Sequence, residues 1–214
     1  MSPKRTLMSE ITAKDVGALR KATGAGMMDA KRALTEAEGD AERAAEILRE
    51  QGLADARKRS DRATDEGTIG HYLHVQADRP VIGVLVELAS ETDFVAKSEV
   101  FQDAARDIAM HIAAFRPQWV TREEVPADAL EKEKELIAAQ ARNDGKPDDI
   151  VEKIVEGRIH SFYEDLVLYD QTFVKSEKFE GTVGQMVEQL VSQMGENIGV
   201  RRFVRLGIGE KEAE

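Results

Sequence analysis

The pattern of apolar and polar positions along the chain predicts three strands. Residues 81–89 form a near-continuous apolar run rich in β-branched side chains, as in a strand with most of its surface buried. Residues 68–77 alternate as a half-buried strand does, and residues 200–208 predict a closing strand. Asp78 and Arg79 are expected to form the first turn, although this pair is not a preferred two-residue turn and a longer connection stays open.

Four later segments are predicted to be helical, three of them from apolar residues that recur at helical spacing. These are residues 101–115, 128–143, 150–163 and 183–194. The first carries a wide apolar stripe that suits packing on a sheet, whereas the second is so charged that we expect it to be solvated or to pack along one thin edge. Ser98 and Thr182 are expected to cap the first and the last of these helices. The pattern predicts an α+β fold with long helices packed on a three-stranded antiparallel sheet.

Three shorter helices are predicted before the first strand. Thr12 is the expected cap of the first, and the glycines after Thr23 break it. The second helix runs from Met27 to about Glu38, and the third is expected to end at Gly52. Together they predict a compact bundle of roughly 45 residues, which is marginal in isolation at that size.

These elements predict a division of the chain into four parts. A bundle domain with its leader takes residues 1–56, and a charged helical linker takes residues 57–66. An α+β core takes residues 67–209, and an acidic tail takes residues 210–214.

A polar segment follows the buried strand and is the strongest candidate for function. Ser90 and Thr92 are both of the residue types that start helices, and Ser90 with Asp93 three positions later also fits the capping pattern. A rigid strand would thus deliver Thr92, Asp93, Phe94 and Val95 to its own carboxyl end. Two interpretations are open. Phe94 is either a local hydrophobic anchor with Asp93 as a first-turn charge, or part of an exposed segment that contacts a partner.

Three segments resemble bacterial elongation factor Ts. The run ELASETDFVAK at 87–97 is similar to the signature of that family, and LRKATGAGMMDAKRAL at 19–34 resembles its amino-terminal motif almost residue for residue. Residues 145–174 resemble its carboxyl-terminal part. The three segments occur in the order of the family and cover most of the chain.

The resemblance implies a guanine-nucleotide exchange factor that binds elongation factor Tu and promotes GDP release during translation elongation. It implies that Thr92, Asp93, Phe94 and Val95 intrude beside the Mg²⁺–phosphate site of that GTPase and dislodge its Mg²⁺, with Phe94 as an apolar wedge and Asp93 as its polar partner. The Mg²⁺ belongs to the GTPase, so we expect no metal site and no cofactor on this chain. The resemblance also implies that the amino-terminal bundle is of the ubiquitin-associated (UBA-like) type.

A second contact with the GTPase is implied at the amino-terminal turn, where Arg20, Met27 and Met28 stand at the matching positions of the family motif. Adjacent residues on a helix point in different directions, so Met27 and Met28 cannot both face one core. Methionine suits an adaptable apolar contact surface. We expect Met27 to contact the partner and leave Met28 open between partner contact and core.

Composition narrows the possible partners. Lys and Arg total 30 against 41 Asp and Glu, a net charge of -11, which argues against direct binding of nucleic acid. The chain has no Cys, which excludes disulfides and thiolate chemistry. We find no signal peptide and no apolar run long enough for a membrane span, so we expect a cytoplasmic protein without a membrane partner.

Catalytic motifs are absent from the sequence: there is no P-loop, no G-x-S-x-G and no H-E-x-x-H. His71 and His74 fall on opposite faces of a strand, the wrong geometry for a shared metal, and His111 is expected at the surface or a boundary. We therefore expect no enzyme. Two other hypotheses are weighed against exchange: an adapter built on the bundle, and a hydrolase that uses Asp93 and a histidine.

The number of core motifs in the chain bears on its expected oligomeric state. Long members of the family carry the core motif in two lobes with a coiled-coil insertion, whereas this chain shows the motif once and no heptad run long enough for a sizeable coiled coil. A single lobe exposes sheet edges, which a two-fold homodimer would cover, giving a 2:2 complex with the GTPase. The alternative is a monomer whose edge is shielded by the helix at 128–143.

Overall fold

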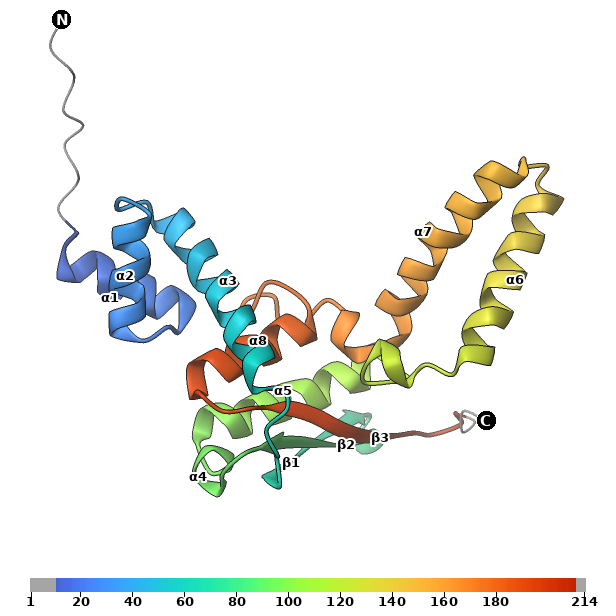
Figure 1. The fold of residues 1–214 in the computed structure, drawn as a ribbon. Helices are drawn as coiled ribbons and strands as arrows, with labels where there is room; N and C mark the ends of the chain where they lie inside the picture. Colours follow the sequence, from blue (N-terminus) through green and yellow to red (C-terminus); the bar gives the residue numbers. More distant parts are fainter. Residues whose placement is uncertain (1–10, 211–214) are drawn as a thin grey trace, which may run out of the picture.

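The computed structural model describes residues 11–210, and of residues 53 and 55–57 it describes the backbone only. Residues 1–10 of the expected leader and residues 211–214 of the expected tail lie outside the described range. The fold is α+β, as predicted, and is built around one antiparallel sheet (Figure 1).

The strand β2 (Arg79–Ser90) is the centre of that sheet, between β1 (Glu66–Gln76) and β3 (Gly199–Gly207). The three strands are antiparallel, which confirms the predicted sheet. Val84, Val86 and Leu88 alternate onto the inner face and are fully buried, which explains the apolar run in the sequence.

The turn between β1 and β2 consists of Ala77 and Asp78, because Gln76 pairs with Arg79 in the ladder. Both turn residues have positive φ, 49° and 61°, as a type I′ hairpin turn requires. The predicted turn at Asp78 and Arg79 is therefore wrong by one residue. Arg79 belongs to the strand because it pairs with Gln76 in the ladder.

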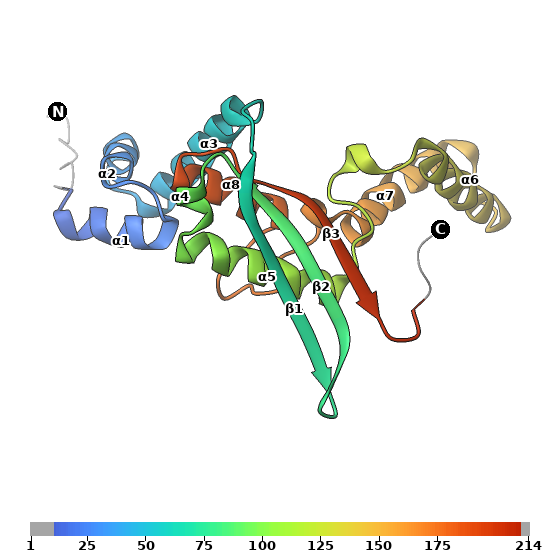
Figure 2. The ribbon, with the colours of Figure 1, turned by 90° about the horizontal axis from the view of Figure 1, so that it is seen from below.

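Helix α5 (Glu99–Phe115) begins after Ser98, the predicted cap, and crosses the inner face of the sheet (Figure 2). Gly70 of β1 allows this close approach, since a Cβ at that position would lie 2.3 Å from the carbonyl oxygen of Ala105. One cluster of buried side chains joins the sheet, α5 and α8 (Val183–Met194). Thr182 caps α8 as predicted, in a capping box with Gln185.

His111 of α5 lies inside this core, which corrects the expectation of a surface or boundary position. Its side chain is fully buried, with Nε2 2.9 Å from Oε1 of Gln171, and Nδ1 accepts a hydrogen bond from the backbone N–H of Val174. Burial lowers the pKa of His111 below its usual value, and the hydrogen bond with Gln171 offsets part of that effect. Both partners come from a loop about sixty residues away, so the helical pattern alone did not reveal them.

The amino-terminal bundle has its own small core. It consists of α1 (Ala13–Thr23), α2 (Met27–Glu36) and α3 (Ala41–Arg59), and Thr12 caps α1 as predicted. The expected end of the third helix at Gly52 is wrong, because α3 continues to Arg59. Gly52 is buried instead, and a Cβ there would lie 3.3 Å from Ser192 of α8, so this glycine allows two helices to approach.

Helices α6 (Ala127–Asn143) and α7 (Asp148–Leu166) pair as a hairpin that projects away from the sheet (Figure 1). The sequence has no heptad run long enough for a sizeable coiled coil, yet the two helices still pair. Their contact buries Ile137, Ala141 and Val151, too few apolar residues for a clear heptad pattern. Helix α6 packs on α7 and does not shield a sheet edge. The monomer alternative, which required this helix to cover the edge, therefore loses its support.

Candidate partner-binding site

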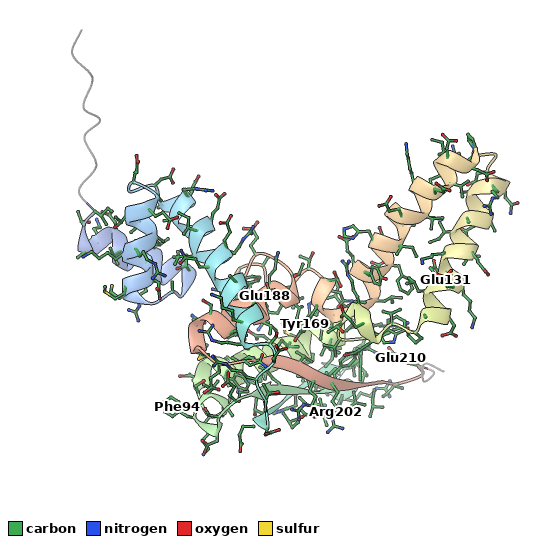
Figure 3. The ribbon with its side chains drawn as sticks, in the orientation of Figure 1. Phe94, Glu131, Tyr169, Glu188, Arg202 and Glu210 are labelled. Carbon is green, nitrogen blue, oxygen red and sulfur yellow. The ribbon has the colours of Figure 1, made fainter. Side chains whose placement is uncertain are left out.

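The segment that follows β2, residues 90–97, is here called the signature turn. It contains α4 (Asp93–Ala96), a single helical turn, before α5 begins. Phe94 is 83% exposed, more than any other large apolar side chain that the structure describes, and it lies on α4 at the surface (Figure 3). The interpretation of Phe94 as a local hydrophobic anchor is therefore wrong.

Thr92, and not Ser90, is the cap of α4. The Thr92 hydroxyl oxygen accepts a hydrogen bond from the backbone N–H of Val95, 3.4 Å away. Ser90 is fully buried, and its hydroxyl donates to the carbonyl oxygen of Thr92 at 3.0 Å. The capping pattern of Ser90 and Asp93 identified the right segment but the wrong cap residue, because the strand continues through Ser90.

Val95 and Ala96 anchor the signature turn in the core. Val95 is only 5% exposed and belongs to the same cluster as the inner face of the sheet. Of the four predicted site residues, Thr92, Asp93 and Phe94 are exposed together, whereas the side chain of Val95 points inward. The turn is thus anchored by buried side chains and carries an exposed aromatic ring.

Asp93 forms an ion pair with Lys97, four residues later on the same turn, at 2.5 Å. The hydrogen bond from Lys97 holds the pKa of Asp93 below its usual value, and the positive charge of Lys97 adds to this effect. Asp93 is therefore ionised at neutral pH. Sequence reasoning missed Lys97, although a carboxylate and a lysine at i and i+4 are a recognisable signal.

A second missed residue is Glu196, in the loop between α8 and β3. Its Oε2 accepts hydrogen bonds from the backbone N–H groups of Glu91 and Thr92, at 3.2 Å and 3.1 Å. Its Oε1 accepts from the hydroxyl of Thr92 at 2.6 Å. More than a hundred residues separate the partners, so no local pattern in the sequence could have indicated this contact.

The amino-terminal candidates Arg20, Met27 and Met28 are all exposed. Met27 and Met28 are 51% and 75% exposed, so the interpretation of Met28 as a core residue is wrong. They are the first two residues of α2, whose buried face begins only at Ala30. Gly26 precedes them as an N-cap without a side-chain hydrogen bond.

No catalytic centre forms around Asp93 in residues 11–210. Its partner is Lys97, whereas His111 is buried against Gln171. In the same range, no group of three or more His, Asp or Glu side chains is placed to hold a metal ion. No helix in the described part of the chain is long and apolar enough to cross a membrane.

Known proteins of one family are similar to most of this chain. A family model described as "Elongation factor TS" matches residues 21–189. The chain is 52% identical to elongation factor Ts of Geobacter metallireducens over 94% of this chain and 90% of that protein. It is 53% identical to the Geobacter sulfurreducens protein with the same coverage, and 52% identical to the Fervidobacterium nodosum protein over 94% of this chain and all of that one. The chain belongs to the elongation factor Ts family.

Proposed function

We propose that this chain accelerates GDP release from elongation factor Tu by placing Phe94 beside the Mg²⁺–phosphate site of that GTPase. As a member of its family, the chain is a nucleotide exchange factor for elongation factor Tu in translation elongation, and not a catalyst of a chemical reaction in the usual sense. The observation that carries the proposal is the exposure of Phe94 on a turn anchored in the core.

Exchange of this kind needs no chemistry from the chain. A bound nucleotide leaves faster when another ligand stabilises the open state of its pocket. Burying an exposed Phe side chain is worth ~1.5–3 kcal/mol, which is available to stabilise that state. The coupling is reciprocal, so GDP must weaken the complex by the same factor by which the complex weakens GDP.

The three exposed site residues of the signature turn, Thr92, Asp93 and Phe94, have separate roles in this proposal. Phe94 supplies the apolar surface that is buried in the complex, and ionised Asp93 competes for groups that orient the Mg²⁺–phosphate site. Thr92 caps α4 and thereby sets the direction of both side chains. Val95 contributes by anchoring the turn, since its own side chain lies in the core.

Arg20, Met27 and Met28 form the proposed second contact, on the bundle. Their exposure at the start of α2 supports this role, because two uncovered methionines offer an adaptable apolar surface. We retain the proposed division into bundle, linker, core and tail. The continuous helix α3 moves the natural end of the bundle from residue 56 to Arg59.

Stopped-flow measurement tests the proposal directly. Elongation factor Tu loaded with a fluorescent GDP analogue is mixed with excess unlabelled GDP, with and without this chain. We expect the rate of release to rise with the concentration of the chain and then to saturate. An unchanged rate would contradict exchange and favour an adapter, which binds without affecting the nucleotide.

The outer face of the sheet supports the proposed homodimer and 2:2 complex. Leu73 and Leu206 flank Gly83 in one cross-strand row, and Val204 lies beside Leu85 in the next. All four of these large side chains are about half exposed or more, and no described helix lies in front of the strands in Figure 2. A second copy related by a two-fold axis would bury this apolar face against its own counterpart.

Light scattering behind size exclusion tests the dimer. We expect a mass near twice the 23.7 kDa of one chain at micromolar concentrations. Leu85→Lys introduces a charge at the centre of the apolar face and should return the mass to that of one chain. A wild-type mass of one chain at all concentrations would rule the dimer out.

We further propose a protein partner rather than nucleic acid, which the net charge of -11 supports, and a cytoplasmic location, which a role in translation supports.

A further inference from the structure

Three hydrogen-bond donors of the signature turn converge on one carboxylate. The backbone N–H of Thr92 and its hydroxyl both donate to Glu196, and the neighbouring N–H of Glu91 donates there as well. An ionised acceptor makes stronger hydrogen bonds than a neutral one. The three bonds hold both the backbone and the side chain of residue 92 from outside the turn.

The hydroxyl bond also determines how Thr92 caps α4. A hydroxyl has one proton to donate and lone pairs that accept. Because the Thr92 proton is directed at Glu196, its lone pair remains available for the N–H of Val95, the cap contact of α4. Phe94 lies between these two residues, so the direction of its ring follows from the cap.

The loop that carries Glu196 is itself fixed. Asn197 donates from its side chain to the carbonyl oxygens of Ser60 and Arg62, at 3.1 Å and 2.8 Å. Its backbone N–H donates to the carboxylate of Glu91 at 2.6 Å. The loop therefore cannot shift without breaking contacts to the segment after α3, and Glu196 has a rigid base.

We infer that Glu196 is a positioning residue for nucleotide exchange, which acts by holding Thr92 so that Phe94 is presented in one orientation. This inference rests on the proposed role of Phe94. Glu196 is half-buried beside the turn, and its carboxylate is engaged within the chain rather than offered to a partner. Its effect on exchange is thus indirect and passes through Phe94.

A double-mutant cycle tests this inference. Stimulated GDP release is measured at saturating concentrations of Glu196→Ala, Phe94→Ala and the double variant. We expect Glu196→Ala to lower the maximal rate about tenfold, since misplacing a contact group by ~1 Å can cost about 10²-fold. The double variant should release GDP at the same rate as Phe94→Ala alone, because the effects of two substitutions do not add when one residue acts through the other.

Conservative variants separate positioning from general stability. In Glu196→Gln one carbonyl oxygen can still accept from both backbone N–H groups, but the amide NH2 cannot accept from the Thr92 hydroxyl, so we expect only part of the rate to return. Thr182→Ala is the matched control, because it removes the cap at the end of α8 opposite to the loop of Glu196. It should lower the melting temperature without slowing exchange.

The possible outcomes separate a failure of the role of Glu196 from a failure of the proposed role of Phe94. If Phe94→Ala leaves exchange unchanged, the proposed function of Phe94 fails and the role of Glu196 fails with it. If Phe94→Ala slows exchange but Glu196→Ala does not, or if their effects multiply, the inference alone is overturned. Should Glu196→Ala not fold, Glu196→Asp, which is one methylene too short to reach Thr92, takes its place in the cycle.

Discussion

The signature turn and the start of α2 both expose large apolar side chains in the first turn of a helix, yet they are built differently. Phe94 follows a threonine cap that Glu196 holds, and Val95 next to it is buried in the core. Met27 and Met28 follow Gly26, which caps without a side-chain hydrogen bond. The first site is suited to insertion in one fixed direction, and the second to an adaptable contact.

This difference implies a division of labour between rate and affinity. A rigid aromatic side chain can stabilise one particular open state of the GTPase, and so change the rate of nucleotide release. Flexible methionines on a glycine turn can add contact area in every state of the partner and so change affinity alone. The predictions below test this division, beginning with the largest expected effect.

Replacing Phe94 should have the largest effect. We expect Phe94→Ala to slow stimulated GDP release at least about tenfold, equivalent to ~1.4 kcal/mol, because the side chain buried in the open state is lost. Stopped-flow fluorescence measures the rate. The melting temperature should hardly change, since the ring is exposed in the free protein.

Val100→Ala is the matched control, because Val100 is an exposed apolar residue on the neighbouring helix α5. It should leave the release rate unchanged. A strong fall in the melting temperature of Phe94→Ala, with exchange intact, would show that the ring stabilises the fold and has no role in exchange.

Replacing both methionines of α2 should weaken binding without lowering the maximal rate. We expect Met27→Ala with Met28→Ala to raise the dissociation constant about tenfold, since about 1.4 kcal/mol of apolar contact is lost. Calorimetric titration measures the affinity, and release at saturating concentrations measures the rate. The double leucine variant keeps the apolar area and should bind like the wild type. A lower maximal rate with unchanged affinity would contradict the division of labour.

The two regions should also differ in their response to pH. His111 is buried as a neutral group in the core, whereas the nine residues of the bundle cluster are all apolar. Burial lowers the pKa of His111 from its ordinary 6.5, so below that pH the unfolded chain binds more protons than the folded one. The free energy of unfolding of the core should therefore fall as pH decreases below 6.5, by up to about 1.4 kcal/mol per pH unit for one proton.

Denaturant unfolding from pH 7.5 to 5.5, followed by the fluorescence of Trp119 near the core, measures this dependence. His111→Gln should be less stable at neutral pH but should show a shallower pH dependence, with the other three histidines unchanged. An equal slope in the two proteins would mean that His111 does not carry the effect.

Sequence patterns predicted the structure well wherever the determining contacts are local. The caps Thr12, Ser98 and Thr182 were each identified from residues within three positions, and all three are confirmed. Gly52 was misread because a glycine after an apolar run commonly ends a helix, whereas its neighbour across the interface, Ser192, lies 140 residues away.

In the candidate site, too, the features set by local contacts were predicted and those set by long-range contacts were not. Thr92, Asp93 and Phe94 were found as one exposed segment because they are adjacent in the sequence and follow a buried strand. The inward direction of Val95 depends on the packing of α4 on the sheet. Glu196 was missed because only the closing of β3 against β2 brings its loop beside the signature turn.

The smallest expected effect concerns Asp93. Its ion pair with Lys97 lies on the surface, and solvent screens such pairs, so Asp93→Asn should leave the melting temperature unchanged. Exchange should slow about two- to threefold, less than for Phe94→Ala, because a charge near the Mg²⁺–phosphate site is lost while the apolar surface remains. The hydrogen bond from Lys97 keeps the pKa of Asp93 below its usual value, so the carboxylate stays ionised well into the acidic range. The wild-type and Asp93→Asn release rates should therefore keep a constant ratio between pH 6 and 8. A ratio that changes across this range would show that another titrating group, and not the charge of Asp93, accounts for the difference.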